Sequence, residues 1–129
     1  MHKLQGKRVL LAEDERLNQE LVKALLAHAG IECVIAENGE KALEKLSHEN
    51  GLFDAVLMDI HMPQMNGLET TRKIRQRGGV FASLPILALT ACDQPEETEK
   101  ALAAGMNGYL HKPIDAQQLF TALAQKLKV

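Results

Sequence analysis

The sequence predicts an α/β fold in which helices cover both faces of a doubly wound, five-stranded parallel sheet. Short apolar runs alternate with amphipathic stretches of helical period along the whole chain. The runs are almost continuously apolar, which is typical of strands buried on both faces. Five strand–helix units in succession favour a parallel sheet. A length of 129 residues suits one compact domain, so we expect residues 1–129 to form a single domain.

The first half of the chain contains three of the expected strands. They cover residues 8–12 (RVLLA), 32–36 (ECVIA) and 53–59 (FDAVLMD). The helix between the first two strands is expected to end at Gly30, because glycine commonly ends helices. A second helix is expected from about Glu40. The apolar positions that recur at helical spacing are Leu21, Val22, Leu25, Leu26, Ala29, Ala42, Leu43 and Leu46.

The second half contains the other strands and helices. Residues 61–67 are expected to be a loop, because Pro63 and Gly67 interrupt them. A helix should begin after Asp93, since it has Pro95 in its first turn and Gly105 past its end. Asp115, with a glutamine three residues later, resembles a capping box that opens the last helix. The remaining elements are a helix at 68–76, an irregular connection at 77–83, strands at 85–90 and 108–112, and the last helix, to about Lys128.

Composition argues against several kinds of protein. A formal charge of −2 and an aromatic content of 3% offer little to nucleic acid or to an anionic membrane. No apolar run approaches the roughly 20 residues that span a bilayer. The N-terminus lacks the apolar stretch of a signal peptide, so we expect a cytoplasmic domain without membrane contact. Cys33 and Cys92 form no CxxC pair and are expected to be reduced, partly buried thiols.

Residues that can carry chemistry follow the expected strands. Ligands of doubly wound sheets bind outside the carboxyl ends of the strands, at the point where the strand order reverses. Side chains that lie far apart in the sequence should therefore meet at this edge. They are Glu13, Asp14, Glu15, Asp59, Thr90 and Lys112.

These residue types suit the transfer of a phosphoryl group. Carboxylates a few ångströms apart repel one another unless a cation lies between them. Oxygen ligands with few protein carboxylates suit Mg²⁺, and an aspartate is a competent nucleophile for forming an acyl phosphate. Thr90 can donate a hydroxyl hydrogen bond and Lys112 can supply positive charge to phosphoryl oxygens.

Four segments of the chain resemble the signature segments of response-regulator receiver domains. They are AEDE at 12–15, LMDIHMPQMNG at 57–67, LTA at 89–91 and YLHKPI at 109–114. Each is weak evidence alone, but together they occur in the right order at the expected strand ends, and the likeness covers essentially the whole chain. The resemblance implies the flavodoxin-like strand order 2-1-3-4-5, for which the general rule on such sheets uses a member of this family as an example.

The resemblance also implies a role for each site residue. Asp59 matches the phosphorylated aspartate. Lys112 matches the phosphate-binding lysine, and the bond before Pro113 would be cis. Thr90 and Tyr109 match the pair that moves on activation, although Tyr109 could instead only cover the sheet edge. The implied Mg²⁺ ligands are Glu13, Asp14, Asp59 and the backbone carbonyl of His61.

Some positions depart from the commonest pattern of the family. Glu13 replaces a more usual Asp, which lengthens one metal ligand but keeps its charge. Glu15 stands where relatives in hybrid kinases often have Asn. His61 and Cys92 occupy the two variable positions that tune the lifetime of the phosphoryl group in the family.

The implied function is that of a signalling phosphoacceptor. Asp59 would take a phosphoryl group from a phosphohistidine on a histidine kinase or a histidine phosphotransfer partner. Slow self-dephosphorylation would act as a timer, so the domain is not expected to be an enzyme. We expect a monomer that binds no nucleic acid directly and carries no output domain. The segments LQGKRVLLAEDE and LTACDQPEETEKALAAGMNGYLHKPI favour a piece of a hybrid sensor histidine kinase over a free-standing regulator.

Three other functions fit the sequence less well than this one. A flavodoxin-like cofactor binder needs a glycine- or hydroxyl-rich phosphate loop after its first strand, where this chain has EDE. A phosphatase with an aspartyl-phosphate intermediate carries a second Asp where this chain has His61. A degenerate receiver that only binds partners would lack a chemical residue. Arg72, Lys73, Arg75 and Arg77 are expected to be a solvated helix face, with partner docking as the minority view, and the histidines show no zinc-ligand spacing.

Overall fold

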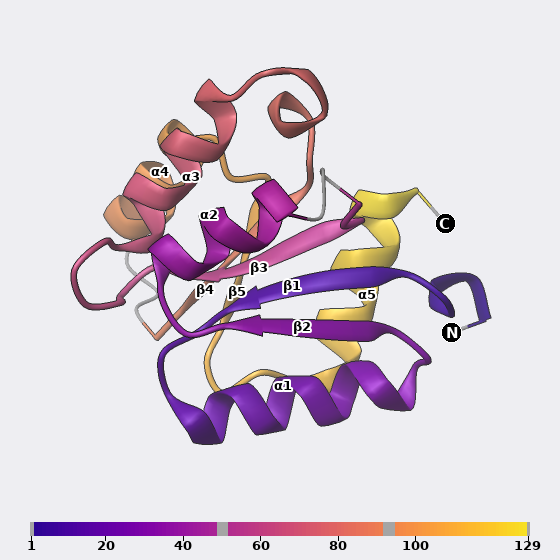
Figure 1. Cartoon of the computed structure of the whole chain (residues 1–129). Helices are drawn as coiled ribbons and strands as arrows, with labels where there is room; N and C mark the ends of the chain where they lie inside the picture. The colour runs from indigo at the N-terminus through magenta and orange to yellow at the C-terminus, as the bar shows by residue number, and fades with distance from the viewer. Residues whose placement is uncertain (1, 49–51, 92–94, 129) are drawn as a thin grey trace.

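The computed structural model describes residues 2–48, 52–91 and 95–128, which form a sheet between two layers of helices (Figure 1). In these residues the strands are all parallel and lie in the order β2-β1-β3-β4-β5. The strands are β1 (Arg8–Ala12), β2 (Glu32–Ala36), β3 (Ala55–Asp59), β4 (Ile86–Thr90) and β5 (Gly108–His111). The predicted doubly wound sheet and its order are confirmed.

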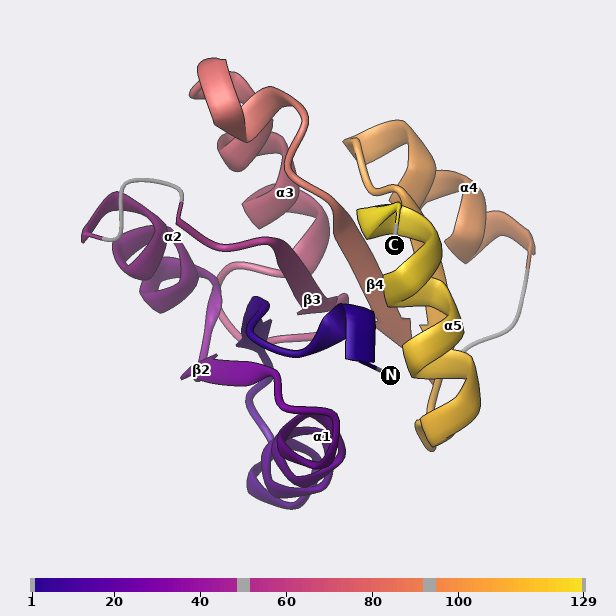
Figure 2. The same cartoon turned by 90° about the vertical axis from the view of Figure 1, so that its right-hand side faces the viewer.

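Helices cover both faces of the sheet. Figures 1 and 2 show α1 and α5 on one face and α2, α3 and α4 on the other. The helices are α1 (Arg16–His28), α2 (Gly39–His48), α3 (Gly67–Gln76), α4 (Pro95–Ala104) and α5 (Ala116–Leu127), with short 3₁₀ helices η1 (His2–Leu4) and η2 (Gly79–Ala82). Within the described part of the chain, no helix combines the length and the apolar content that a membrane crossing requires.

Most expected boundaries are correct to within a residue, and the exceptions have local causes. Strand β3 begins at Ala55 because Asp54 uses its side chain to accept the backbone N–H of Arg8, at 2.7 Å. Strand β4 begins after Pro85, which has no N–H to give to the ladder. The irregular connection at 77–83 contains η2, which the sequence analysis did not predict.

Side-chain caps fix the starts of two helices next to the site. The Asp115 carboxylate accepts the backbone N–H of Gln118 at 3.0 Å, which confirms the predicted cap of α5. The Asn66 side chain accepts the N–H of Glu69 at 2.9 Å and opens α3 in the same way. Because Asn66 lies in a stretch expected to be loop, its capping role was not predicted.

The sheet separates two apolar clusters. Side chains of a strand alternate between its faces, so Leu10, Met58 and Ala88 pack under α2, α3 and α4. Leu11 and Leu89, from neighbouring positions, pack under α1 and α5. Strands β1, β3 and β4 are almost completely buried, as their continuous apolar runs predict.

Arg75 departs from the expectation of a solvated basic face on α3. Arg72, Lys73 and Arg77 are exposed as expected. Arg75 instead reaches across the end of β4 and donates hydrogen bonds of 2.7–2.9 Å to the carbonyls of Phe81, Leu84 and Gly105 and to the side chain of Asn107. It joins α3 to the connections that precede β4 and β5, so its role is structural.

Candidate functional site

An acidic cluster lies at the carboxyl edge of the sheet, where β1 and β3 are neighbours. The side chains of Glu13, Asp14 and Asp59 each offer a carboxylate oxygen, and these oxygens lie within 4.8 Å of one another. Glu13 and Asp59 are buried, whereas Asp14 is exposed. The structure therefore brings together the acids that the strand-end argument selected.

Backbone contacts hold Glu13 in place. Its N–H donates to the Ala36 carbonyl at 3.0 Å and continues the β1–β2 ladder by one residue. Its Oε2 atom accepts the N–H of Glu15 at 3.0 Å. The Gln19 side chain donates to the Glu13 carbonyl at 2.7 Å. Gln19 is a positioning contact that the sequence analysis missed, because a polar residue on a surface helix carries no signal of its own.

Asp59 is fixed by the turn that follows β3. The N–H of His61 donates to Asp59 Oδ1 at 3.2 Å, and the N–H of Gly67 donates to the Ile60 carbonyl at 2.9 Å. A Cβ atom at Gly67 would collide with the Asp59 carbonyl oxygen and lie 2.9 Å from the Ile60 Cα. Gly67 therefore does more than interrupt the loop, since it lets α3 start against the backbone of the candidate nucleophile.

Lys112 reaches the acidic cluster from the end of β5. Its Nζ atom lies 2.8 Å from Glu13 Oε1 and 3.2 Å from Asp59 Oδ2. Its backbone N–H donates to the Thr90 carbonyl at 2.8 Å, and the bond to Pro113 is cis, as the resemblance implied. Strand β5 ends at His111, one residue earlier than expected, and the Lys112 N–H makes the last bond to β4 before the chain turns.

The charges in the cluster perturb one another. Burial, followed by the charge of Glu13, raises the pKa of Asp59 from 3.8 to about 6, although Lys112 and the His61 N–H oppose the rise. Burial alone would lower the pKa of Lys112, but its contacts with Glu13 and Asp59 raise it above the ordinary value. The Lys112 ammonium thus balances only part of the negative charge of Glu13, Asp14 and Asp59. The remaining negative charge would attract a cation.

Thr90 lies on β4, the strand next to β3, and Tyr109 lies on β5, one strand further out. Thr90 is the last residue of β4, is buried, and is paired in register with His111. Its strand pairs with β3 so that Asp59 is opposite Leu89. Tyr109 is 44% exposed, and its ring contacts the His111 ring edge-on with a 5.3 Å centroid distance. Thr90 therefore ends the strand beside that of Asp59, whereas Tyr109 lies one strand further out and is exposed.

His61 and Cys92 are the two variable positions beside the site. The His61 side chain is exposed, and its Nε2 atom lies 2.7 Å from Oε1 of Glu97 in α4. Cys92 lies outside the described residues. Cys33 is a free, partly buried thiol whose pKa is raised to about 11 by burial, as expected of an unreactive cysteine.

The residues present fit a hard divalent cation. Their donor atoms are carboxylate oxygens, the class of ligand that Mg²⁺ prefers. Oε1 of the buried Glu13 has Lys112 as its charged neighbour and makes no further hydrogen bond within the described residues. The backbone carbonyl of His61 stays a predicted ligand.

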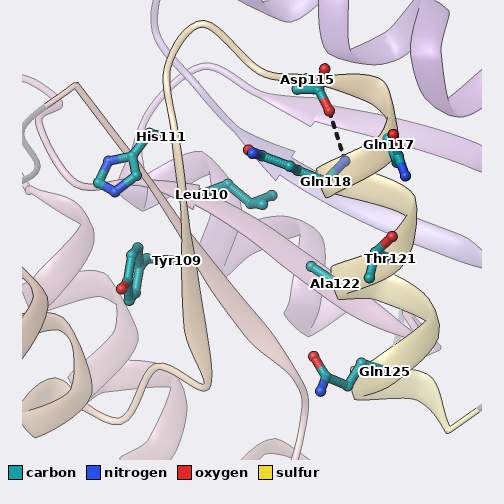
Figure 3. A pocket seen from close by; sticks show the side chains of 9 residues that line it. All are labelled: Tyr109, Leu110, His111, Asp115, Gln117, Gln118, Thr121, Ala122 and Gln125. Carbon is teal, nitrogen blue, oxygen red and sulfur yellow. Dashed lines mark hydrogen bonds between the residues drawn. The ribbon is translucent and has the colours of Figure 1, made fainter.

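A separate groove lies between β5 and α5, away from the acids (Figure 3). It encloses about 620 Å³ and is bordered by Tyr109 and His111 on one side and by α5 on the other. The α5 side is rich in amide and hydroxyl groups, from Gln117, Gln118, Thr121 and Gln125. Asp115 is its only acidic lining residue, and none of Glu13, Asp14 and Asp59 lines it, so it is no part of the candidate phosphoryl site.

Comparisons with known proteins agree with this geometry. The chain is 38% identical over 120 residues to hybrid signal transduction histidine kinase I of Dictyostelium discoideum, covering 90% of this chain but only 7% of that protein. It is 38% identical to two-component response regulator ORR41 of Oryza sativa, with 92% of each chain covered. It also superposes with a TM-score of 0.87 and 33% identity on the receiver domain of a Pseudomonas aeruginosa sensor histidine kinase, covering 96% and 99% of the two chains. That structure holds a magnesium ion coordinated in its active site cleft.

The match to a protein family covers most of the chain. The model of the response regulator receiver domain matches residues 9–124, from β1 into α5. This span contains each candidate residue of the acidic cluster together with Thr90, Tyr109 and Lys112. This match favours a receiver domain over the two alternatives considered from the sequence, a flavodoxin-like cofactor binder and an aspartyl-phosphate phosphatase. The chain belongs to the response regulator receiver domain family of two-component systems.

Proposed function

We propose that this chain is a phosphoacceptor in a two-component phosphorelay and that Asp59 receives the phosphoryl group. The supporting observation is the position of the Asp59 carboxylate, which lies beside the acids that follow β1 and in contact with the Lys112 ammonium. A nucleophilic carboxylate needs a cation-rich environment to approach a phosphoryl group, and the site can supply it from both sides.

Mg²⁺ is the proposed cofactor. Glu13, Asp14 and Asp59, with the backbone carbonyl of His61, would hold it. A bound Mg²⁺ supplies charge neutralisation for the phosphoryl oxygens and for the acidic cluster. The magnesium ion in the Pseudomonas receiver domain supports this assignment.

The proposed donor is a phosphohistidine on a histidine kinase or a histidine phosphotransfer domain. An oxygen of Asp59 attacks phosphorus in line, and the bond from phosphorus to the imidazole nitrogen breaks with its electron pair going to that nitrogen. Lys112 then pairs with a phosphoryl oxygen in place of the Asp59 carboxylate. Because its Nζ atom already lies 3.2 Å from Asp59 Oδ2, this exchange needs little movement.

The proposed response is a shift of Thr90 and Tyr109. The Thr90 hydroxyl moves toward the phosphoryl group, and Tyr109 moves from its 44% exposed position into the vacated space. This change alters the surface of α4, β5 and α5, where the groove of Figure 3 lies. Equal partner affinity for the phosphorylated and unphosphorylated forms would count against this step.

The wider setting is also a proposal. We place the chain in the cytoplasm, as a single monomeric receiver domain, 1–129, that belongs to a hybrid kinase. Its slow self-dephosphorylation would set the duration of a signal and would not be a metabolic activity.

Labelling with a small donor tests the central claim. The chain is incubated with acetyl phosphate and Mg²⁺, and intact-mass spectrometry follows the gain of one labile phosphoryl group. Asp59→Asn should abolish the adduct, and EDTA should suppress it in the wild type. Asp54→Asn is the matched control, because Asp54 precedes the same strand at the opposite edge of the sheet. An equal adduct in Asp59→Asn, or none in the wild type, would refute the proposal, and the second result would favour a module that only binds partners.

A further inference from the structure

A bridge between two side chains crosses the carboxyl edge of the sheet beside Asp59. His61 lies in the connection after β3, and Glu97 lies in the first turn of α4. The His61 Nε2 atom is 2.7 Å from Glu97 Oε1. The His61 side chain is 67% exposed, whereas the Glu97 side chain is only 17% exposed. An exposed ring therefore lies against a largely buried carboxylate.

The bridge brings the ring to a buried oxygen. Glu97 Oε1 is buried and forms no well-aligned hydrogen bond among the residues described, and the His61 Nε2 atom, at 2.7 Å, is its close polar neighbour. A buried carboxylate oxygen without a partner is unfavourable, so the contact restrains the ring. The distance requires a hydrogen on Nε2, which a neutral imidazole can carry as well as a charged one. The bridge does not depend on the charge of His61.

The location of the bridge follows from the topology. Strands β3 and β4 are neighbours, with Asp59 opposite Leu89. His61 follows β3 by two residues and its backbone N–H contacts Asp59 Oδ1, while α4 follows β4. The ring and the carboxylate therefore connect the segments that leave these strands, next to the acceptor carboxylate.

We infer that Glu97 is a positioning residue that holds the His61 imidazole at the entrance of the phosphoacceptor site. The restrained ring narrows the path by which small reactants reach phosphorus. This inference rests on the proposed function of Asp59. It assigns a role to a residue of α4 that is remote in sequence from the acidic cluster.

The chemistry gives the restrained ring a recognisable signature. In loading by acetyl phosphate, an Asp59 oxygen bonds to phosphorus, and acetate leaves on the opposite side with the electron pair of its bond. In hydrolysis, water attacks from that same opposite side, the bond to Asp59 breaks and its electron pair returns to the carboxylate. The proton lost by water passes to the phosphate product or to solvent. A ring at this entrance slows both steps by a similar factor.

Paired rate measurements test the inference. Wild type, Glu97→Ala, His61→Ala and the double variant are loaded with acetyl phosphate and Mg²⁺, and then the donor is removed to follow hydrolysis. We expect each of these variants to load and to hydrolyse roughly three to five times faster, the scale of losing one partly exposed pair. The steady phosphorylated fraction should barely change, because both rates rise together. Glu99→Ala is the matched control, since Glu99 is exposed on the same helix.

Further variants separate restraint from a merely structural effect. Glu97→Gln keeps an acceptor oxygen, so its loading and hydrolysis rates should equal those of the wild type. If the faster rates of Glu97→Ala came from a general loosening of α4, Glu97→Gln would show them too. The double variant should be no faster than either single variant. Rates in Glu97→Ala equal to those in Glu99→Ala, additive effects in the double variant, or a change in only one of the two rates would overturn the inference.

The same experiments distinguish the two proposals. If the wild type takes up no phosphoryl group, the proposed function fails, and the entrance role fails with it. If the wild type is labelled at Asp59, only the comparison of rates decides the role of Glu97. Imidazole ¹⁵N spectra of the unphosphorylated chain give a separate readout. We expect the wild type to carry a hydrogen on His61 Nε2 and the Glu97→Ala variant to show a changed Nε2 signal. An unchanged spectrum in Glu97→Ala would contradict the bridge.

Discussion

Removing the charge of Asp59 should stabilise the protein when no divalent cation is present. Folding raises the pKa of this carboxyl from 3.8 to about 6, mainly through burial and then through the charge of Glu13. A rise of this size corresponds to about 3 kcal/mol of unfavourable free energy once the group is ionised. Solvent at the open edge of the sheet screens part of it, so we expect Asp59→Asn to gain about 1 to 2 kcal/mol at pH 7.5 in EDTA.

The gain should depend on pH in a defined direction. Below about pH 4, Asp59 is protonated in both the folded and the unfolded states, and its ionisation costs nothing. As pH rises through about 6, the folded state must give up a proton that it holds more tightly than the unfolded state does. The stability of the wild type therefore falls over this window, and the advantage of Asp59→Asn should be largest above it and vanish below it.

Urea denaturation followed by circular dichroism measures this difference at pH 4.5, 6 and 7.5. Glu44→Gln, at an exposed carboxylate of α2, is the control and should change the free energy of unfolding by less than about 0.5 kcal/mol. Added Mg²⁺ should reverse the order, because it binds the folded wild type and stabilises it by mass action. The reasoning is refuted if Asp59→Asn is no more stable than the wild type in EDTA at pH 7.5, or if its advantage grows as pH falls.

Three further substitutions test the packing around the site, each by urea denaturation with EDTA. Lys112→Met should lower the free energy of unfolding by about 2 kcal/mol at pH 7.5, because it leaves buried carboxylates without their counter-charge; an unchanged midpoint would mean that solvent already screens them. Gly67→Ala should cost about 2 kcal/mol and also slow labelling by acetyl phosphate, since the new methyl group displaces the turn after β3; normal labelling at reduced stability would contradict the second effect. Arg75→Met should cost about 3 kcal/mol, because its carbonyl partners lose their donor, whereas Arg72→Met at an exposed position of the same helix should stay within about 0.5 kcal/mol; equal effects of the two arginine variants would exclude a structural role for Arg75.

The parts of the fold that could be predicted are those with a local signal. Residues 8–12 and 55–59 are visible as strands because continuous apolar runs need cover on both faces. The acidic cluster followed from one rule, that parallel strands end at a common edge. Glu13 and Asp59 could therefore be placed together although 46 positions separate them in the numbering.

The parts that could not be predicted depend on partners far away in the sequence. In the sequence, Arg75 looks like any arginine of a solvent-exposed helix face. Only the structure shows its hydrogen bond to the Gly105 carbonyl, 30 residues away, which gives it a structural role. Glu97 lies in the first turn of α4, but its partner His61 follows another strand, so no local pattern in the sequence marks the pair. The sequence indicates only that Gly67 interrupts regular structure in a loop. Its close approach to the Asp59 backbone is evident only in three dimensions.

The division of the interior by the sheet has a consequence for how a change at the site would spread. Alternation along β4 places Thr90 on the same side as Ala88, which packs under α4, and alternation along β5 places Tyr109 opposite Leu110, which packs under α5. A displacement of Thr90 or Tyr109 would therefore act first on the layer of α2, α3 and α4. It would reach α5, on the other face of the sheet, through the groove that Tyr109 borders.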